Sequence, residues 1–172
     1  MSRSKAASPG TPATTALSRA GVDYTAHMYE HDPAAASYGL EAATALGVEP
    51  ERVFKTLLVT LDDGSLAVGI VPVDRSLDLK AVAAALGTKK VAMADPAVAE
   101  RVTGYVRGGI SPLGQRRRLP TVLDASAQRH VTMLVSGGRR GFDVELSPAD
   151  LTRLTAATYA PIARSGDGGS RT

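Results

Sequence analysis

The chain has 172 residues, of which 44% are hydrophobic and 22% charged, as in one folded globular domain. A wholly disordered chain would have fewer apolar residues and a larger charge imbalance than the net +3 found here. No apolar run approaches the ~18 residues that a membrane-spanning helix needs, and residues 1–13 hold no signal-peptide core, so we expect a cytoplasmic protein that binds no membrane.

One domain is expected at residues 14–164, between a Ser/Pro/Thr-rich flexible tail at 1–13 and a Gly/Ser-rich flexible tail at 165–172. The predicted elements are, in chain order, a helix at 14–20, a strand at 23–29, a helix at 38–46, strands at 53–61 and 66–73, a helix at 77–86, a strand at 90–93, a helix from 96 to about 102, strands at 121–123, 131–135 and 142–146, and a last helix from 148.

Local signals support these boundaries. A glycine follows each of the first three helices, where a left-handed C-cap is typical. The sequence Ser147-Pro148-Ala149-Asp150 has the N-cap serine and first-turn proline of a helix start. Asp62-Asp63-Gly64-Ser65 has the composition of a hairpin turn. Strands that alternate with short helices predict a single α/β domain with a mixed sheet, and so many strands in so small a domain can curl into a barrel-like sheet.

Cysteine is absent from the chain, which excludes disulfides, thiolate metal sites and a cysteine nucleophile. A thiol that takes part in the chemistry must therefore come from the substrate. His27 and His31 are four residues apart, a helical metal spacing, but they lie in and just after a predicted strand. No third ligand is close in the sequence, so we expect neither a metal nor another cofactor.

Lys55 is an unusual residue in its predicted strand. Because side chains alternate along a strand, Lys55 shares the inward face with Val53, Leu57 and Val59. A lysine among core-facing residues is costly unless it is paired or functional. Two interpretations remain open: a functional ammonium, or a lysine at a bulge or edge whose head group reaches solvent.

Two glycine-rich segments could approach a ligand closely. The first runs from Gly108-Gly109 to Gly114-Gln115; its glycines allow backbone N–H groups to reach an anion or an oxyanion. It is no nucleotide-binding P-loop, because Gln115 and Arg116 replace the required Lys and Ser/Thr. The second runs from Ser136 to Asp143, and a hairpin there would bring its two ends together. Tight turns alone would also explain both segments.

Basic residues gather in one stretch. Between Arg101 and Arg118 there are five arginines and no acidic residue. Such a patch suits a polyanion, although a solvated loop would have the same composition.

Several segments together resemble the YbaK-type Cys-tRNA(Pro)/Cys-tRNA(Cys) deacylases, free-standing relatives of the editing domain of prolyl-tRNA synthetases. The resemblance covers nearly all of residues 24–163. The matching segments are Tyr29-Glu30-His31-Asp32-Pro33, the sequence from Val53 to Val59, Leu77-Asp78-Leu79-Lys80, Lys89-Lys90, Met93-Ala94-Asp95-Pro96, Thr103-Gly104-Tyr105, the sequence from Gly108 to Gln115, and the sequence from Ser136 to Gly141.

The resemblance implies a mixed, barrel-like sheet flanked by short helices, and it implies a site. The essential lysine of the family falls on Lys55, and the glycine whose backbone binds the substrate carbonyl region falls on Gly108. The remaining expected substrate-binding residues are Tyr29, Tyr38, Thr56, Gly109, Ser136 and Asp143. Tyr38 stands where relatives can have phenylalanine, which leaves the polarity of the pocket open.

The resemblance also implies an activity: removal of cysteine from mischarged Cys-tRNA(Pro) through attack of the substrate thiol on its own ester, with release of a thiolactone. An enzyme that works in this way is a lyase (EC 4.2.-.-) rather than a hydrolase. Arg116, Arg117 and Arg118 are expected to bind tRNA phosphates, and prolyl-tRNA synthetase is a possible partner. Two alternatives stay open: an Ala-tRNA(Pro) deacylase of the sister group, and a catalytically silent tRNA- or synthetase-binding module.

Overall fold

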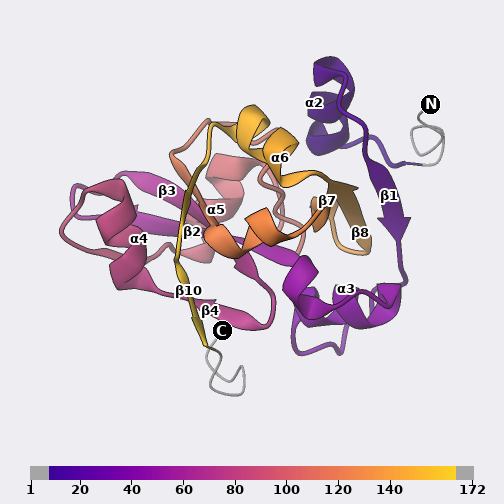
Figure 1. Cartoon of the computed structure of the whole chain (residues 1–172), viewed down its shortest axis with the longest axis horizontal. Helices are drawn as coiled ribbons and strands as arrows, with labels where there is room; N and C mark the ends of the chain where they lie inside the picture. The colour runs from indigo at the N-terminus through magenta and orange to yellow at the C-terminus, as the bar shows by residue number, and fades with distance from the viewer. Residues whose placement is uncertain (1–7, 166–172) are drawn as a thin grey trace.

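The computed structural model describes residues 8–165, in which short helices alternate with the strands of a mixed sheet (Figure 1). The helices are α2 (Pro12–Ala20), α3 (Tyr38–Leu46), α4 (Leu79–Leu86), α5 (Pro96–Thr103) and α6 (Pro148–Thr155), with 3-10 turns η1 (Pro50–Arg52) and η2 (Ala125–Arg129). The strands are β1 (Thr25–Met28), β2 (Phe54–Leu61), β3 (Leu66–Pro72), β4 (Arg75–Leu77), β5 (Val91–Met93), β6 (Thr121–Asp124), β7 (Met133–Arg139), β8 (Phe142–Leu146), β9 (Thr158–Ala160) and β10 (Ala163–Ser165). The predicted α/β class with a mixed sheet is confirmed.

Five strands form the largest sheet, in the order β5-β2-β3-β6-β9. The predicted hairpin pairs β2 with β3 antiparallel, whereas β3–β6 and β6–β9 are parallel. A second, antiparallel sheet has the order β1-β8-β7 and lies beside the first in Figure 1. A parallel bridge between Val53 and Leu134 joins the two sheets.

The first helix begins earlier than the sequence pattern predicts. Thr11 caps it: the Thr14 amide donates to Thr11 Oγ1 at 3.1 Å, and the Thr11 amide donates to Thr14 Oγ1 at 2.9 Å. Thr11 Oγ1 also donates to the carbonyl of Gly137 on β7. Thr11 and Ala13 are buried, so the described end of the predicted tail 1–13 belongs to the folded domain. The rest of that tail, and residues 166–172 of the other, lie outside the described residues.

The sequence pattern did not predict three of the strands. The strands β4, β9 and β10 have three residues each, and none of them has the apolar run that marks the equally short β5. Residue 77 therefore ends β4 rather than beginning a helix, and α4 starts at Leu79 after the N-cap Asp78. Asp124 fixes the start of β10, because its Oδ1 accepts hydrogen bonds from the amides of Ile162 and Ala163.

The strand β7 also differs from its predicted range. It runs to Arg139 rather than stopping at residue 135, and a register shift between Ser136 and Arg139 absorbs the glycines. The expected long loop from Ser136 to Asp143 is therefore mostly strand. Within residues 8–165, no helix is long and apolar enough to cross a bilayer.

Both faces of β2 are covered, but by different elements. Phe54 and Leu58 belong to the main core between the two sheets, which also receives apolar side chains of α2, α5 and α6. On the opposite face, Val53 packs beneath α3 and Val59 beneath α4. Lys55 lies between Val53 and Val59 on this face and belongs to neither of the two smaller clusters.

Candidate active site

A cavity of about 540 Å³ opens over β2 between α3 and β4. Its walls are the first turn of α3, residues 53–57, the end of β4, the loop around Gly108, and β10. The predicted site residues that line it are Tyr29, Tyr38, Lys55, Thr56, Gly108, Ser136 and Asp143. The fold therefore brings together residues that lie more than a hundred positions apart in the sequence.

Lys55 is half-buried in this cavity. Burial lowers the pKa of its ammonium, and the carboxylate of Asp74 partly offsets this effect. Among residues 8–165, no carboxylate lies within ion-pair distance of Lys55. An unpaired ammonium whose pKa is lowered is well suited to give a proton to a departing oxygen.

Asp143 and Tyr29 form a second polar group of the cavity. The Asp143 side chain has no hydrogen-bond or ion-pair partner among the described residues and is only 6% exposed. Burial raises its pKa to about 7. Burial, together with the negative charge of Asp143, raises the pKa of Tyr29 to about 12. The Tyr29 amide donates to the carbonyl of Gly141 at 3.0 Å, which fixes this residue beside the β7–β8 hairpin.

The loop that contains Gly108 and Gly109, called the glycine loop below, packs closely against Tyr38 and the β7–β8 hairpin. Gly108 has a φ of +83°, and a Cβ there would lie 2.8 Å from the Tyr38 ring and 2.9 Å from Arg140 Nε. A Cβ on Gly109 would lie 2.7 Å from the Arg139 backbone, so the two glycine-rich segments pack directly against each other. The Gly109 amide donates to the Val106 carbonyl, which leaves Gly108 as the candidate oxyanion donor. Gly109, which was expected to bind substrate, packs against the Arg139 backbone instead and does not line the cavity.

Tyr38 forms one wall of the cavity at the start of α3. Its ring lies 5.0 Å from the Arg140 guanidinium carbon, a cation–π contact, and 5.7 Å from the ring of His31. His31 Nδ1 in turn lies 2.9 Å from a carboxylate oxygen of Glu41. These contacts hold the aromatic ring against the glycine loop.

Two hydroxyl groups among the predicted site residues, those of Ser136 and Thr56, also line the cavity. Ser136 Oγ accepts a hydrogen bond from the Gly138 amide at 3.1 Å. The Thr56 hydroxyl is buried without a hydrogen-bond partner among the described residues. A buried hydroxyl without a partner costs free energy, and a bound polar ligand would supply one.

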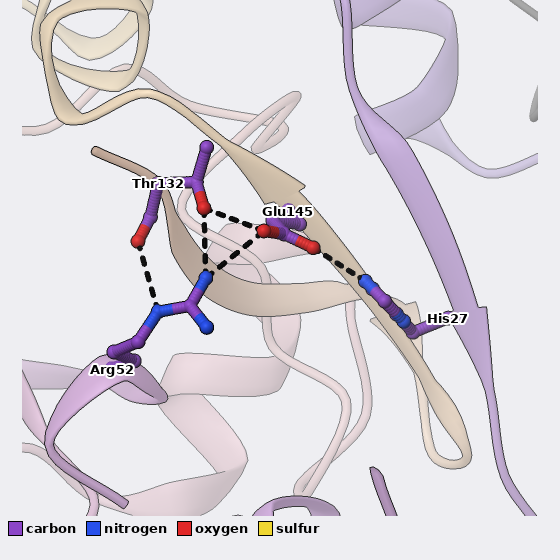
Figure 2. A network of polar contacts seen from close by, with 4 residues as sticks. All are labelled: His27, Arg52, Thr132 and Glu145. Atoms are coloured by element: carbon purple, nitrogen blue, oxygen red, sulfur yellow. Dashed lines mark hydrogen bonds and ion pairs between the residues drawn. The ribbon is translucent and has the colours of Figure 1, made fainter. Parts of the chain in front are cut away.

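A network outside the cavity ties these strands together (Figure 2). Glu145 on β8 accepts hydrogen bonds from Arg52 and Thr132, and it lies 2.7 Å from His27 Nε2. Burial acts to raise the pKa of Glu145, but these three partners outweigh it, and the pKa is lowered. Since Arg52 lies two residues before β2 and Glu145 lies on β8, the network links the strand that carries Lys55 to the strand that carries Asp143.

The predicted tRNA-binding arginines lie outside the cavity. Arg116, Arg117 and Arg118 are exposed. Arg116 Nη1 donates to the carbonyl of Arg101 at 3.4 Å, and Arg118 Nη2 donates to that of Leu154 at 3.2 Å. Their role in tRNA binding stays a prediction.

The sequence pattern missed other residues that line the cavity. Arg107 and Arg164 are the charged ones, and Met93 and Leu79 are apolar. Arg107 adjoins Gly108, so its position beside the glycine loop was a usable signal. Arg164 belongs to β10, which the pattern did not reveal. Within residues 8–165 no three His, Asp or Glu side chains gather as metal ligands would.

Comparisons with known proteins show what the chain is similar to. The profile of the family described as the aminoacyl-tRNA editing domain matches residues 32–154. A candidate Cys-tRNA(Pro)/Cys-tRNA(Cys) deacylase of Enterococcus faecalis, EbsC, is 41% identical over 120 residues, which are 70% of this chain and 73% of the relative. The resemblance inferred from the sequence motifs is thereby confirmed.

Solved structures show the same fold. The crystal structure of a candidate trans-editing enzyme for prolyl-tRNA synthetase superposes with a TM-score of 0.76 at 25% identity, covering 91% of this chain and 99% of the other. The crystal structure of a hypothetical protein superposes with a TM-score of 0.80 at 23% identity, covering 90% and 100%. The mixed-sheet architecture is thus shared over nearly the whole chain.

Proposed function

Because the chain belongs to the aminoacyl-tRNA editing domain family, we propose that it removes cysteine from mischarged Cys-tRNA(Pro). The similarity to the candidate Enterococcus faecalis deacylase supports cysteine as the amino acid. The similarity to the candidate trans-editing enzyme supports tRNA(Pro) as the carrier and prolyl-tRNA synthetase as a partner.

The observation that carries the proposal is the unpaired Lys55 ammonium in a cavity where, among the described residues, no cysteine and no histidine-paired hydroxyl is found. The chain has no cysteine. The serine and threonine hydroxyls that line the cavity belong to Ser37, Thr56, Ser76, Ser136 and Ser165, and among the described residues none of them has a histidine base within hydrogen-bond distance. The nucleophile is therefore assigned to the substrate, whose own thiol lies two bonds from the α-carbon of the ester.

In the proposed reaction the substrate sulfur attacks its own ester carbonyl. A carbon–sulfur bond forms and the bond from the carbonyl carbon to the ribose oxygen breaks. That oxygen takes a proton from Lys55, and the proton lost by the thiol restores the Lys55 ammonium. The products are a four-membered thiolactone and an uncharged tRNA, and water then opens the ring to free cysteine. Intramolecular attack of this kind can contribute roughly 7–11 kcal/mol when the geometry is good.

Four of the cavity residues have a defined task in this scheme. Lys55 gives a proton to the ribose oxygen, and its lowered pKa favours the transfer. The Gly108 amide donates to the carbonyl oxygen as negative charge develops there. Asp143, with Tyr29 beside it, accepts a hydrogen bond from the α-ammonium of the aminoacyl group, which returns its carboxylate to the ionised form.

A deacylation assay tests the proposal directly. Release is measured from tRNA(Pro) charged with cysteine, alanine or proline, with and without prolyl-tRNA synthetase. The proposal predicts rapid release of cysteine alone, by the wild-type chain and not by Lys55→Ala. Preferential release of alanine would instead identify an Ala-tRNA(Pro) deacylase. Binding without any release would identify a silent tRNA-binding module.

A further inference from the structure

Three arginines surround the mouth of the cavity, although only the deeper residues were expected from the sequence. Arg107 and Arg164 line the opening directly. Arg140 lies beside Arg107, because its Nε donates to the Arg107 carbonyl at 2.8 Å, and its guanidinium stacks on the ring of Tyr38, which lines the cavity. We call Arg107, Arg140 and Arg164 the rim arginines. They come from the glycine loop, the β7–β8 hairpin and β10, and all three are exposed.

The positive charge of this rim is not neutralised locally. None of the ion pairs among residues 8–165 involves a rim arginine. The carboxylate of Glu100 accepts from the backbone amide of Arg107 and not from its guanidinium. Within the cavity, Lys55 adds another positive charge, against the single buried carboxylate of Asp143. Such an arrangement suits a ligand with several negative charges at the mouth.

We propose that the rim arginines bind the phosphodiesters of the unpaired 3′ end of the tRNA, so that they hold the terminal ribose over Lys55. The inference rests on the proposed function, because the aminoacyl ester is placed in the cavity. An ester between Gly108 and Lys55 puts the terminal ribose at the opening, and the phosphates that precede this ribose then reach the rim. Arginine is suited to this contact, since its planar guanidinium can form two parallel hydrogen bonds to one phosphate.

The contacts of Arg140 indicate that the rim is preorganised. Two contacts fix its guanidinium: a hydrogen bond to the Arg107 carbonyl and a cation–π contact with the Tyr38 ring. Little side-chain freedom therefore remains to be lost when a phosphate binds. The same two contacts link the rim to Gly108, whose absent Cβ makes room for both. A phosphate held at the rim therefore fixes the position of the oxyanion donor relative to the ester.

Two stable probes test the proposal by calorimetry with the full chain. The first is 3′-amino-3′-deoxyadenosine with cysteine in amide linkage, which has no phosphate. The second is the trinucleotide CCA with the same amide at its end, which has two internucleotide phosphates. We expect the wild-type chain to bind the trinucleotide at least tenfold more tightly. The log–log dependence of this affinity on salt should be steeper by about 1.4, since each phosphate contact on a single strand contributes about 0.7.

The variant Arg107→Gln/Arg140→Gln/Arg164→Gln should lose this preference and bind both probes as the wild-type chain binds the nucleoside. The double variant Arg107→Gln/Arg164→Gln keeps the contacts of Arg140 intact and should lose part of the preference even if the triple variant folds poorly. The matched control removes three exposed arginines that do not line the cavity, in the variant Arg19→Gln/Arg129→Gln/Arg153→Gln. It should retain the full preference.

The outcomes separate this inference from the proposed function. A rim variant that still prefers the trinucleotide would overturn the inference, as would a wild-type chain that binds both probes equally. Either result would leave cysteine release from Cys-tRNA(Pro), measured in parallel, unaffected. A wild-type chain that binds neither probe and releases no cysteine would contradict the proposed function itself.

Discussion

Asp143 lies directly opposite Ser136 in the β7–β8 ladder, at the last regular pair before the register shifts toward Arg139. This shift lets β7 accommodate Gly137 and Gly138 while Asp143 stays in register. The result is a buried carboxylate at the cavity edge of β8, between Phe142 and Val144, which are fully buried in the main core.

The position of Asp143 predicts a pH dependence of stability. Its pKa is raised from 3.8 to about 7 in the folded chain, so the folded state binds the proton more tightly than the unfolded state. The free energy of unfolding should therefore fall as pH rises from about 4 to 7, by up to roughly 4 kcal/mol from this group. Urea unfolding at several pH values measures the fall.

The matched variant for this prediction is Asp143→Asn, which keeps the shape of the side chain and removes its titration. It should be more stable than the wild type at pH 8 and should show a shallower fall between pH 4 and 7. Parallel curves for the two proteins would mean that Asp143 does not carry a raised pKa.

Lys55 should be essential for activity but not for folding. Replacing it by alanine removes the proposed proton donor, and we expect cysteine release to fall by about 10²–10⁴-fold. The variant Lys55→Arg should not restore activity, because a planar guanidinium gives up its proton too reluctantly and is larger than an ammonium. Single-turnover release from Cys-tRNA(Pro) measures both, and thermal melting confirms folding. A fully active Lys55→Ala chain would show that Lys55 has no catalytic role.

Gly108 should tolerate no side chain. In Gly108→Ala the new methyl group would meet Tyr38 and Arg140, and we expect the loop to shift and cysteine release to fall at least tenfold. The matched control is Gly64→Ala in the β2–β3 turn, which has a similar φ of +84° but open space around its Cβ position. Both variants should lose about 1 kcal/mol from backbone strain, but only Gly108→Ala should lose activity. Equal activities would show that the close approach at Gly108 has no functional role.

The arginines at 116–118 should contribute to binding of the whole tRNA. If all three contact phosphates of the duplex stem, replacing them by glutamine should flatten the log–log salt dependence of tRNA binding by up to about 3. Fluorescence anisotropy with labelled tRNA(Pro) at several salt concentrations gives this slope. A slope that matches the wild type would mean that these arginines are a solvated loop and that the tRNA contacts another face.

Much of the cavity could be predicted from sequence, because its central residues carry local signals. Lys55 interrupts an apolar strand, and the glycines at 108 and 109 mark a special backbone. The hairpin pattern alone brought Ser136 and Asp143 together. By contrast, Arg164 was missed, since β10 has three residues and depends on distant partners in β4 and on Asp124 rather than on an alternation of its own. The unpaired state of Asp143 also depends on packing, which no local pattern reveals.

The central claim is that the sulfur of the substrate, and not a group of the protein, attacks the ester. The most direct test compares the rates at which the wild-type chain releases amino acid from tRNA(Pro) charged with cysteine, S-methylcysteine or serine, with binding of each measured in parallel. The account predicts that all three bind, that only cysteine is released rapidly, and that a cysteine thiolactone can be trapped. Release of S-methylcysteine or serine as fast as cysteine, or an acyl group trapped on Ser136, would contradict it.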